Sequence, residues 1–129
     1  MNETVRTGGC MCGAVRYRVV GEPLWVNYCH CADCRRSSAA PVSVFAGVHE
    51  DQFTVEQGEA THYASSPGVV RSFCATCGTP LTYQSSKFPG EVHVLIGSFD
   101  EPRNFTPTGH VFIAEQLPWL HISDDLPRE

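Results

Sequence analysis

The sequence predicts an all-β domain of many short strands, and two observations carry that prediction. First, apolar residues recur at every second position over short segments, which is the pattern of a half-buried strand. Second, glycine and proline residues that favour turns separate these segments. No segment repeats apolar residues at helical spacing over ten positions. The 129 residues are expected to form a single domain, 1–129, with its core at about residues 8–122.

The predicted strands follow one another along the chain. Val15, Tyr17 and Val19 alternate with arginines and give the clearest pattern. Strands are predicted at residues 15–19, 24–28, 42–45, 53–56, 69–73, 81–84, 92–96 and 110–114. One helical turn is predicted at 32–38, and residues 123–129 are expected to form a loosely held tail.

Composition and charge narrow the class of protein. Apolar residues make up 42% of the chain and charged residues 18%, as in an ordinary globular protein. The net charge of −5 is unsuited to a phosphate backbone, so no nucleic-acid partner is expected. No apolar run approaches the roughly 20 residues of a membrane span, so no membrane partner is expected either. The polar N-terminus lacks the apolar segment of a secretion signal, which predicts a cytoplasmic protein.

Seven cysteines in three clusters are the most informative feature of the chain. Short spacings between cysteines, in a sequence with no recognisable secretion signal, favour a role as metal ligands over disulfide bonds. Residues two apart in a strand point to one face, so a C-x-C can aim both sulfurs at one ion, and a C-x-x-C on a tight turn can do the same. The clusters are Cys10 with Cys12, then Cys29, Cys31 and Cys34, and finally Cys74 with Cys77.

The spacing suggests two zinc sites. The middle cluster lies within six residues and can hold one ion unaided, which leaves the two distant pairs to complete each other. We call Cys10, Cys12, Cys74 and Cys77 the four-thiol cluster, and Cys29, Cys31 and Cys34 the three-thiol cluster. Four thiolates saturate a structural zinc, whereas three leave a position open for chemistry. Two alternatives remain: a closed second site completed by His30, His110 or His121, and iron–sulfur ligation.

Three segments resemble motifs of the glutathione-dependent formaldehyde-activating enzymes, a family that includes centromere protein V. Residues 8–17, GGCMCGAVRY, match its opening G-G-C-x-C-G-x-V-R-Y. Residues 28–36, YCHCADCRR, resemble C-H-C-x-x-C-R, and residues 73–81, FCATCGTPL, resemble F-C-x-x-C-G-x-x-L. The resemblance spans about residues 8–122 and implies a zinc-containing β-tent.

The resemblance also implies an activity. The four-thiol cluster would hold a structural zinc, and the three-thiol cluster a second zinc near the place where glutathione acts. The family reaction joins formaldehyde to the glutathione thiol and gives S-hydroxymethylglutathione, which is a carbon–sulfur lyase reaction run in reverse. We therefore expect a zinc-dependent enzyme acting on adducts of glutathione, or a similar small thiol, with an aldehyde.

Physical reasoning assigns roles around the three-thiol cluster. A thiol in the open position would be deprotonated and attack a carbonyl, or zinc would polarise that carbonyl. With the three cysteines, Arg35 is predicted as catalytic, because it could offset the thiolate charge or pair with a substrate carboxylate. Arg35, Arg36 and His110 are predicted to bind the substrate. Asp33 is a candidate general base, although turn capping is the more ordinary role.

A different class of function fits the same motifs. A non-catalytic zinc module that binds a protein or buffers metal would also use clustered cysteines. Trp119 and His121 are further candidates for the pocket, with a core position the alternative for Trp119. Exposed strand edges would allow a homodimer.

Overall fold

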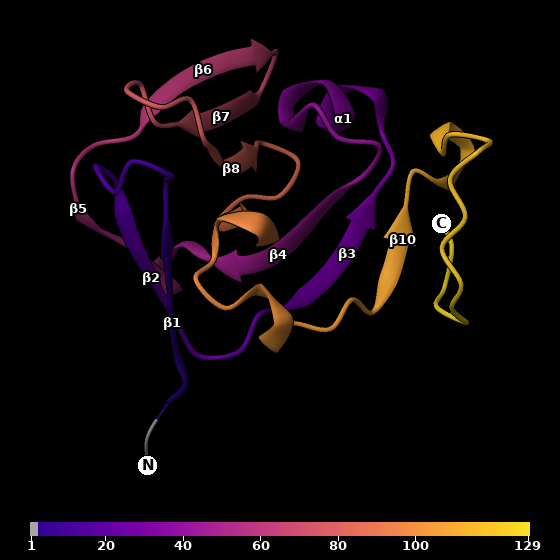
Figure 1. Cartoon of the computed structure of the whole chain (residues 1–129), viewed down its shortest axis with the longest axis horizontal. Helices are drawn as coiled ribbons and strands as arrows, with labels where there is room; N and C mark the ends of the chain where they lie inside the picture. Colours follow the sequence, from indigo (N-terminus) through magenta and orange to yellow (C-terminus); the bar gives the residue numbers. More distant parts are fainter. Residues whose placement is uncertain (1–2) are drawn as a thin grey trace.

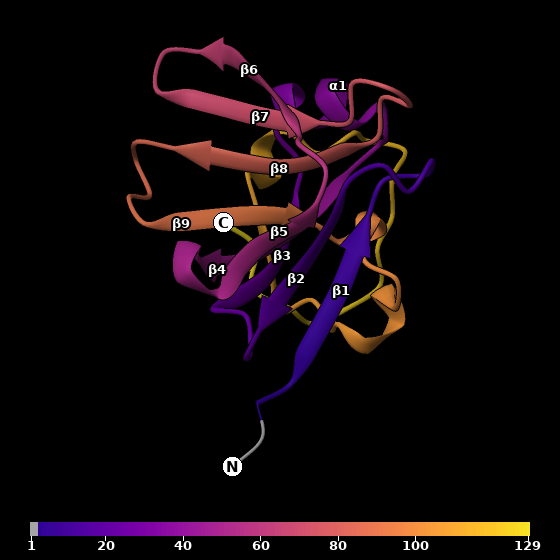
Figure 2. The ribbon, with the colours of Figure 1, turned by 90° about the vertical axis from the view of Figure 1, so that its left-hand side faces the viewer.

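Two β-sheets form the framework of the computed structural model, which describes residues 3–129 (Figure 1). The smaller sheet has three antiparallel strands in the order β1-β2-β5. These strands are β1 (Val5–Gly9), β2 (Arg16–Val20) and β5 (Phe53–Gln57). β1 and β2 run across the direction of β8 and β9 (Figure 2).

The larger sheet has seven strands in the order β10-β3-β4-β9-β8-β7-β6, all antiparallel except that β10 runs parallel to β3. Its strands are β3 (Trp25–Cys29), β4 (Ser43–His49), β6 (Thr61–Ser66), β7 (Val69–Phe73), β8 (Pro80–Ser85), β9 (Glu91–Leu95) and β10 (Gly109–Val111). The all-β prediction is therefore confirmed.

The α-helix α1 (Ala32–Ser38) coincides with the predicted helical turn. It follows β3 directly and lies beside the β6–β7 hairpin (Figure 1). The remaining helical turns are η1 (Glu50–Gln52), η2 (Ile96–Ser98), η3 (Pro102–Asn104) and η4 (Ile113–Glu115). Within the described chain, no helix is long and apolar enough to cross a membrane.

The main core lies between the two sheets. Val15, Tyr17 and Val19, from β2 and the turn before it, are almost fully buried, as their alternation predicts. They share one cluster with buried residues of the larger sheet, among them Val48 of β4 and Val94 of β9. The Tyr17 hydroxyl shares a 2.6 Å hydrogen bond with the Ser98 hydroxyl, so it is satisfied inside the core.

The opposite face of the larger sheet positions the site. Strand pairing aligns Trp25 with Gly47, Gly47 with His93, and His93 with Tyr83, which in turn pairs with Arg71. Because alternate residues of a strand share a face, these side chains and Cys29 emerge on one side. That face and the first turn of α1 together line a cavity.

Three local expectations differ from the structure. The alternation rule does not predict β1 or β6, because β1 contains two glycines and every residue of β6 is exposed. The predicted strand at 110–114 is β10 at 109–111 and then gives way to η4.

The expected loose tail at 123–129 is instead held against β10. The His110 amide donates to the Pro127 carbonyl at 2.8 Å, and the Glu129 amide donates back to the His110 carbonyl at 3.0 Å. The segment runs beside β10 (Figure 1). Its attachment depends on backbone hydrogen bonds, which a polar sequence does not reveal.

Candidate metal centres and active site

The four-thiol cluster joins the two sheets. Cys10 and Cys12 lie in the turn between β1 and β2, and Cys74 and Cys77 lie between β7 and β8. All four sulfurs lie within 4.8 Å of one another. Gly78 has a φ of 82°, and its amide donates to the Cys74 carbonyl at 2.8 Å, which closes the C-x-x-C turn as the glycine after Cys77 predicts.

The sulfur spacing fits a zinc tetrahedron. Cys12 Sγ lies 3.6 Å from Cys10 Sγ and 3.8 Å from Cys74 Sγ. Four sulfurs at about 2.3 Å from a central zinc would be about 3.8 Å apart. A disulfide needs about 2.05 Å, and all seven cysteines are free thiols. The disulfide alternative is therefore excluded in this structure.

Local hydrogen bonds favour ionised sulfur at Cys10 and Cys77. At Cys12 the Ala14 amide acts in the same direction, but the neighbouring thiols and burial outweigh it and raise the pKa to about 11. The Val15 amide donates to Cys10 Sγ at 3.3 Å and lowers the pKa of Cys10. Thr79 shares a 3.2 Å hydrogen bond with Cys77 and, with its own amide, lowers the pKa of Cys77 to about 5. Thiolate is the form that binds a metal, so these contacts prepare the ligands.

The three-thiol cluster sits where β3 passes into α1. Cys29 ends the strand, Cys31 is the N-cap of the helix, and Cys34 lies in its first turn. Cys29 Sγ and Cys31 Sγ are 3.6 Å apart, again a zinc–thiolate spacing. The Cys34 amide donates to Cys31 Sγ at 3.3 Å. The sulfur of Cys31 therefore caps the helix and also faces the sulfurs of the other two cysteines.

The protonation of these three sulfurs is interdependent. Hydrogen bonds from Cys29, and then from Cys34, hold the pKa of Cys31 far below its usual range. The same pairing raises the pKa of Cys29, because a second thiolate beside Cys31 would be repelled. All three sulfurs can be thiolates together only beside a cation, and three clustered thiols are a donor set that suits zinc.

A cavity of about 550 Å³ opens over the three-thiol cluster, and all three cysteines line it. Within residues 3–129, no fourth cysteine, histidine or acidic side chain joins these sulfurs in a ligand group. His30, His110 and His121 therefore do not complete the site. A molecule in the cavity can approach the position where a fourth ligand would lie.

Hydroxyl groups fix the helix that carries Cys34. Ser37, Ser38 and Ser43 all donate to the Cys34 carbonyl, at 3.2, 2.9 and 2.9 Å. Ser37 and Ser38 belong to α1 itself, whereas Ser43 begins β4. The bond from Ser43 thus holds α1, and Cys34 with it, against β4.

The cationic side chain at the three-thiol cluster is Arg71, which sequence reasoning missed. Its Nη1 and Nη2 lie 3.9 and 3.8 Å from Cys34 Sγ. Ser37 and Ser65 accept from the guanidinium at 3.0 and 3.2 Å, and its carbon lies 4.9 Å from the centre of the Tyr83 ring. Arg71 is far from the cluster in sequence, so only the sheet brings the two together.

The structure places the predicted arginines elsewhere. Arg35 donates to the His30 carbonyl and, at 2.5 Å, to the Glu115 carbonyl, so its guanidinium ties α1 to η4 and does not line the cavity. Arg36 lines a second cavity of about 410 Å³, which shares Arg71 with the first. Asp33 lines both cavities, while Cys31 takes the capping role.

Comparison with known proteins shows the fold and the family of this chain. A crystal structure of a Rhodobacter sphaeroides protein superimposes with a TM-score of 0.65 at 23% identity, covering 95% of this chain and 99% of that one. A curated protein of Halomonas elongata, provisionally named a glutathione-dependent formaldehyde-activating enzyme, is 29% identical over 125 residues, covering 89% of this chain and 79% of that protein. The family model described as glutathione-dependent formaldehyde-activating enzyme matches residues 5–115. The chain belongs to this family.

A chain of hydrogen bonds begins between the thiols of the three-thiol cluster and extends to Asp124, beyond the residues of the family match. His30, between two of the thiols, is fully buried and bonds through Nε2 to His110 Nδ1 at 2.9 Å. His110 Nε2 in turn bonds to Asp124 Oδ2 at 2.9 Å. Because the carboxylate accepts, a neutral His110 donates to it from Nε2 and accepts from His30 at Nδ1.

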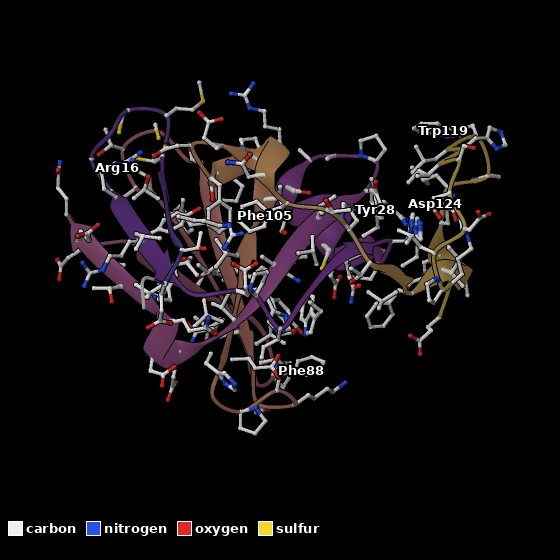
Figure 3. The ribbon with its side chains drawn as sticks, turned by 90° about the horizontal axis from the view of Figure 1, so that it is seen from below. Arg16, Tyr28, Phe88, Phe105, Trp119 and Asp124 are labelled. Carbon is white, nitrogen blue, oxygen red and sulfur yellow. The ribbon has the colours of Figure 1, made fainter. Side chains whose placement is uncertain are left out.

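His110 lies away from the cavity. It is fully buried and is not among the residues that line the cavity, so its role in substrate binding stays a prediction. Tyr28 stacks on its ring at 4.6 Å, and Asp124 lies on the same side of the molecule (Figure 3). Trp119 and His121 are both exposed, and neither lines the cavity.

Proposed function

We propose that this family member is a zinc-dependent enzyme of the carbon–sulfur lyase type, which joins a small thiol such as glutathione to an aldehyde such as formaldehyde and reverses that addition. One observation carries the proposal: the three-thiol cluster opens into a cavity, and no fourth side chain of the described residues joins its ligand group. The family match and the name of the Halomonas elongata relative support the choice of substrates.

The reaction balances without an oxidant or reductant. The thiol loses its proton, its sulfur attacks the carbonyl carbon, and a carbon–sulfur bond forms. The carbonyl π-electron pair moves to oxygen, which takes up a proton and becomes a hydroxyl. A zinc ion bound at the three-thiol cluster would stabilise the attacking sulfur as a thiolate or polarise the carbonyl.

The residues of the chain supply charge balance and position. Three thiolates leave a doubly charged ion with a net negative charge, which weakens it as an acid. Arg71 sets a positive charge beside Cys34 and is held there by two serines and Tyr83, so it fills the role that sequence reasoning gave to Arg35. The same guanidinium lines the cavity and can pair with a carboxylate of the thiol substrate.

Two carboxyl groups border the cavity near the cluster. Glu115 already accepts from the Ala32 amide at 3.1 Å, which anchors the start of α1. Asp33 is exposed on the first turn of α1 and lines the same cavity. Asp33 is thus placed to exchange the proton that moves from sulfur to oxygen.

The test is the rate of adduct exchange. NMR exchange spectroscopy of ¹³C-formaldehyde with glutathione should show faster interconversion in the presence of the zinc-loaded protein than in buffer. Cys31→Ser should fold, because serine also caps a helix, and should lose the acceleration. An unaccelerated reaction with the parent protein would favour the non-catalytic zinc module. A cytoplasmic location and a homodimer stay predictions from sequence.

A further inference from the structure

The cavity over the three-thiol cluster continues into a compartment lined by rings, and we propose that this compartment binds an aromatic substituent on the aldehyde substrate. The inference rests on the proposed function, because it concerns the second substrate of that reaction. We call the compartment the aromatic box. Its rings belong to Trp25, Phe45, Tyr83, Phe88 and His93.

The rings of the aromatic box surround His93. Their centroids lie 4.6 Å from the His93 ring for Trp25, 5.1 Å for Phe88 and 5.3 Å for Tyr83, which is the spacing of favourable ring pairs. His93 is 6% exposed, and burial lowers its pKa even though Glu91 accepts from Nε2 at 2.9 Å. The imidazole is therefore neutral near pH 7. The aromatic box thus presents uncharged ring faces and edges to a bound molecule.

The sheet register places the aromatic box next to the thiols. Trp25 lies four residues before Cys29 on the same face of β3, and Phe45 on β4 is level with the point midway between them. At about 3.3 Å per residue, Phe45 is about 7 Å and Trp25 about 13 Å along the strand from Cys29. A ring attached to a carbonyl carbon at the three-thiol cluster would extend into this space.

Gly47 allows the Trp25 indole to lie against the sheet. A Cβ atom at residue 47 would overlap that indole, so a larger residue would displace the ring. The absence of a side chain on β4 at this position makes room for the indole beside His93, with which Gly47 pairs. The box therefore depends on a specific glycine as well as on its rings.

Size and polarity separate the two substrates. Formaldehyde is about as large as one or two waters of about 30 Å³, whereas the cavity has the volume typical of a site for a much larger molecule. Glutathione carries two carboxylates and an ammonium group, which suit the charged lining at Arg71, Lys87, Asp33 and Glu115. Placed among the rings, those groups would lose water and gain no partner. The aromatic box is therefore suited to an apolar, flat group.

A matched pair of inert ligands tests the box directly. S-Methylglutathione has the size of a formaldehyde adduct, and S-benzylglutathione that of an aromatic aldehyde adduct. Isothermal titration calorimetry with the zinc-loaded protein should show about tenfold tighter binding of the benzyl ligand, because its ring leaves water. The parent protein should also accelerate adduct exchange of glutathione with benzaldehyde, measured by NMR beside formaldehyde.

Phe88→Ala should reduce the preference for the benzyl ligand about threefold to tenfold. Phe88 is 42% exposed, so this change leaves the fold intact. Trp119→Ala is the matched control, because Trp119 is 64% exposed and lies at a distant edge of the molecule from Phe88 (Figure 3). The control should bind both ligands as the parent does.

The outcomes separate the two proposals. Equal binding of both ligands, with formaldehyde exchange intact, would overturn the aromatic box and leave the proposed function standing. A benzyl preference that Phe88→Ala does not reduce would also overturn the box. Tight benzyl binding without exchange of either aldehyde would overturn the proposed function, and with it the assignment of the box to an aldehyde.

Discussion

The four-thiol cluster takes its ligands from both sheets, whereas the three-thiol cluster takes all of its ligands from six consecutive residues. Cys12 and Cys74 are 62 positions apart, yet their sulfurs lie within 3.8 Å. Holding them together closes a long loop, which is costly in chain entropy unless a strong interaction compensates. Cys29, Cys31 and Cys34 close no such loop, and their sulfurs face a cavity. From this difference in sequence separation we predict that the four-thiol cluster stabilises the fold and that the three-thiol cluster takes part in the reaction.

The strongest test of this comparison is one substitution in each cluster. Cys74→Ser should give unfolded or insoluble protein, because a structural zinc contributes about 10–16 kcal/mol while a domain of this size has about 5–15 kcal/mol in total. Far-UV circular dichroism and solubility measure the effect. A native spectrum from this variant would contradict the role of the four-thiol cluster.

The same substitution at Cys31 should leave the fold intact and remove one metal site. Cys31→Ser should keep the native circular dichroism spectrum and bind about one zinc ion per chain, against two for the parent. The cause is that the N-cap survives while one of three ligands is weakened. Metal analysis of the purified variant provides the count, and two tightly bound ions in it would contradict the assignment.

A smaller effect is expected at Arg71. Arg71→Gln should slow adduct exchange about tenfold to a hundredfold, which is the rate change expected from losing a hydrogen bond to a charged group. The unfolding temperature should change little. Arg36→Gln is the control, since Arg36 lines only the second cavity. Partial recovery in Arg71→Lys would show that charge matters. Equal losses at both arginines would instead indicate a general effect of surface charge.

The smallest effect concerns the support behind the three-thiol cluster. The hydrogen bond from His110 lowers the pKa of Asp124 to about 2 in the folded protein, against about 3.9 in an unfolded chain. Its carboxylate therefore stabilises the fold above about pH 4, and this contribution is lost as the pH falls toward 2. Asp124→Asn should therefore lower the free energy of unfolding at pH 7, where the zinc-loaded protein is folded and the carboxylate is ionised, measured by urea titration. An unchanged free energy of unfolding would show that Asp124 is not coupled to folding.

Much of this architecture can be predicted from sequence where the signal is local. The alternation at Val15, Tyr17 and Val19 identifies a strand that is buried as expected, and the predicted helix at 32–38 has the bounds of α1. The spacing of the cysteines also sorts the thiols into the two groups that the structure assembles. The strand, the helix and the three-thiol cluster need only neighbours in the chain, because strand faces and chelate geometry are local properties. The two distant cysteine pairs follow by elimination once the three-thiol cluster is set aside.

The rest of the site cannot be predicted in this way because it depends on pairing across strands. Arg71, Tyr83 and His93 share one face of the larger sheet, and only the order of its strands turns that face into a cavity wall. The sequence gives one indication of this cavity wall, namely the aromatic residues Phe45 and Tyr83 on that face of the sheet. Proximity in sequence favours Arg35, but its direction on α1 leads away from the cavity.

The most direct measurement is the absorption spectrum of the cobalt-substituted protein during titration with glutathione. We expect a change in the cobalt bands of the parent, because a thiol can approach the ion at the three-thiol cluster. In Cys31→Ser we expect no change, because the intact four-thiol cluster holds the remaining cobalt. Bands in the parent that stay constant at saturating glutathione would contradict the claim that the second site is open.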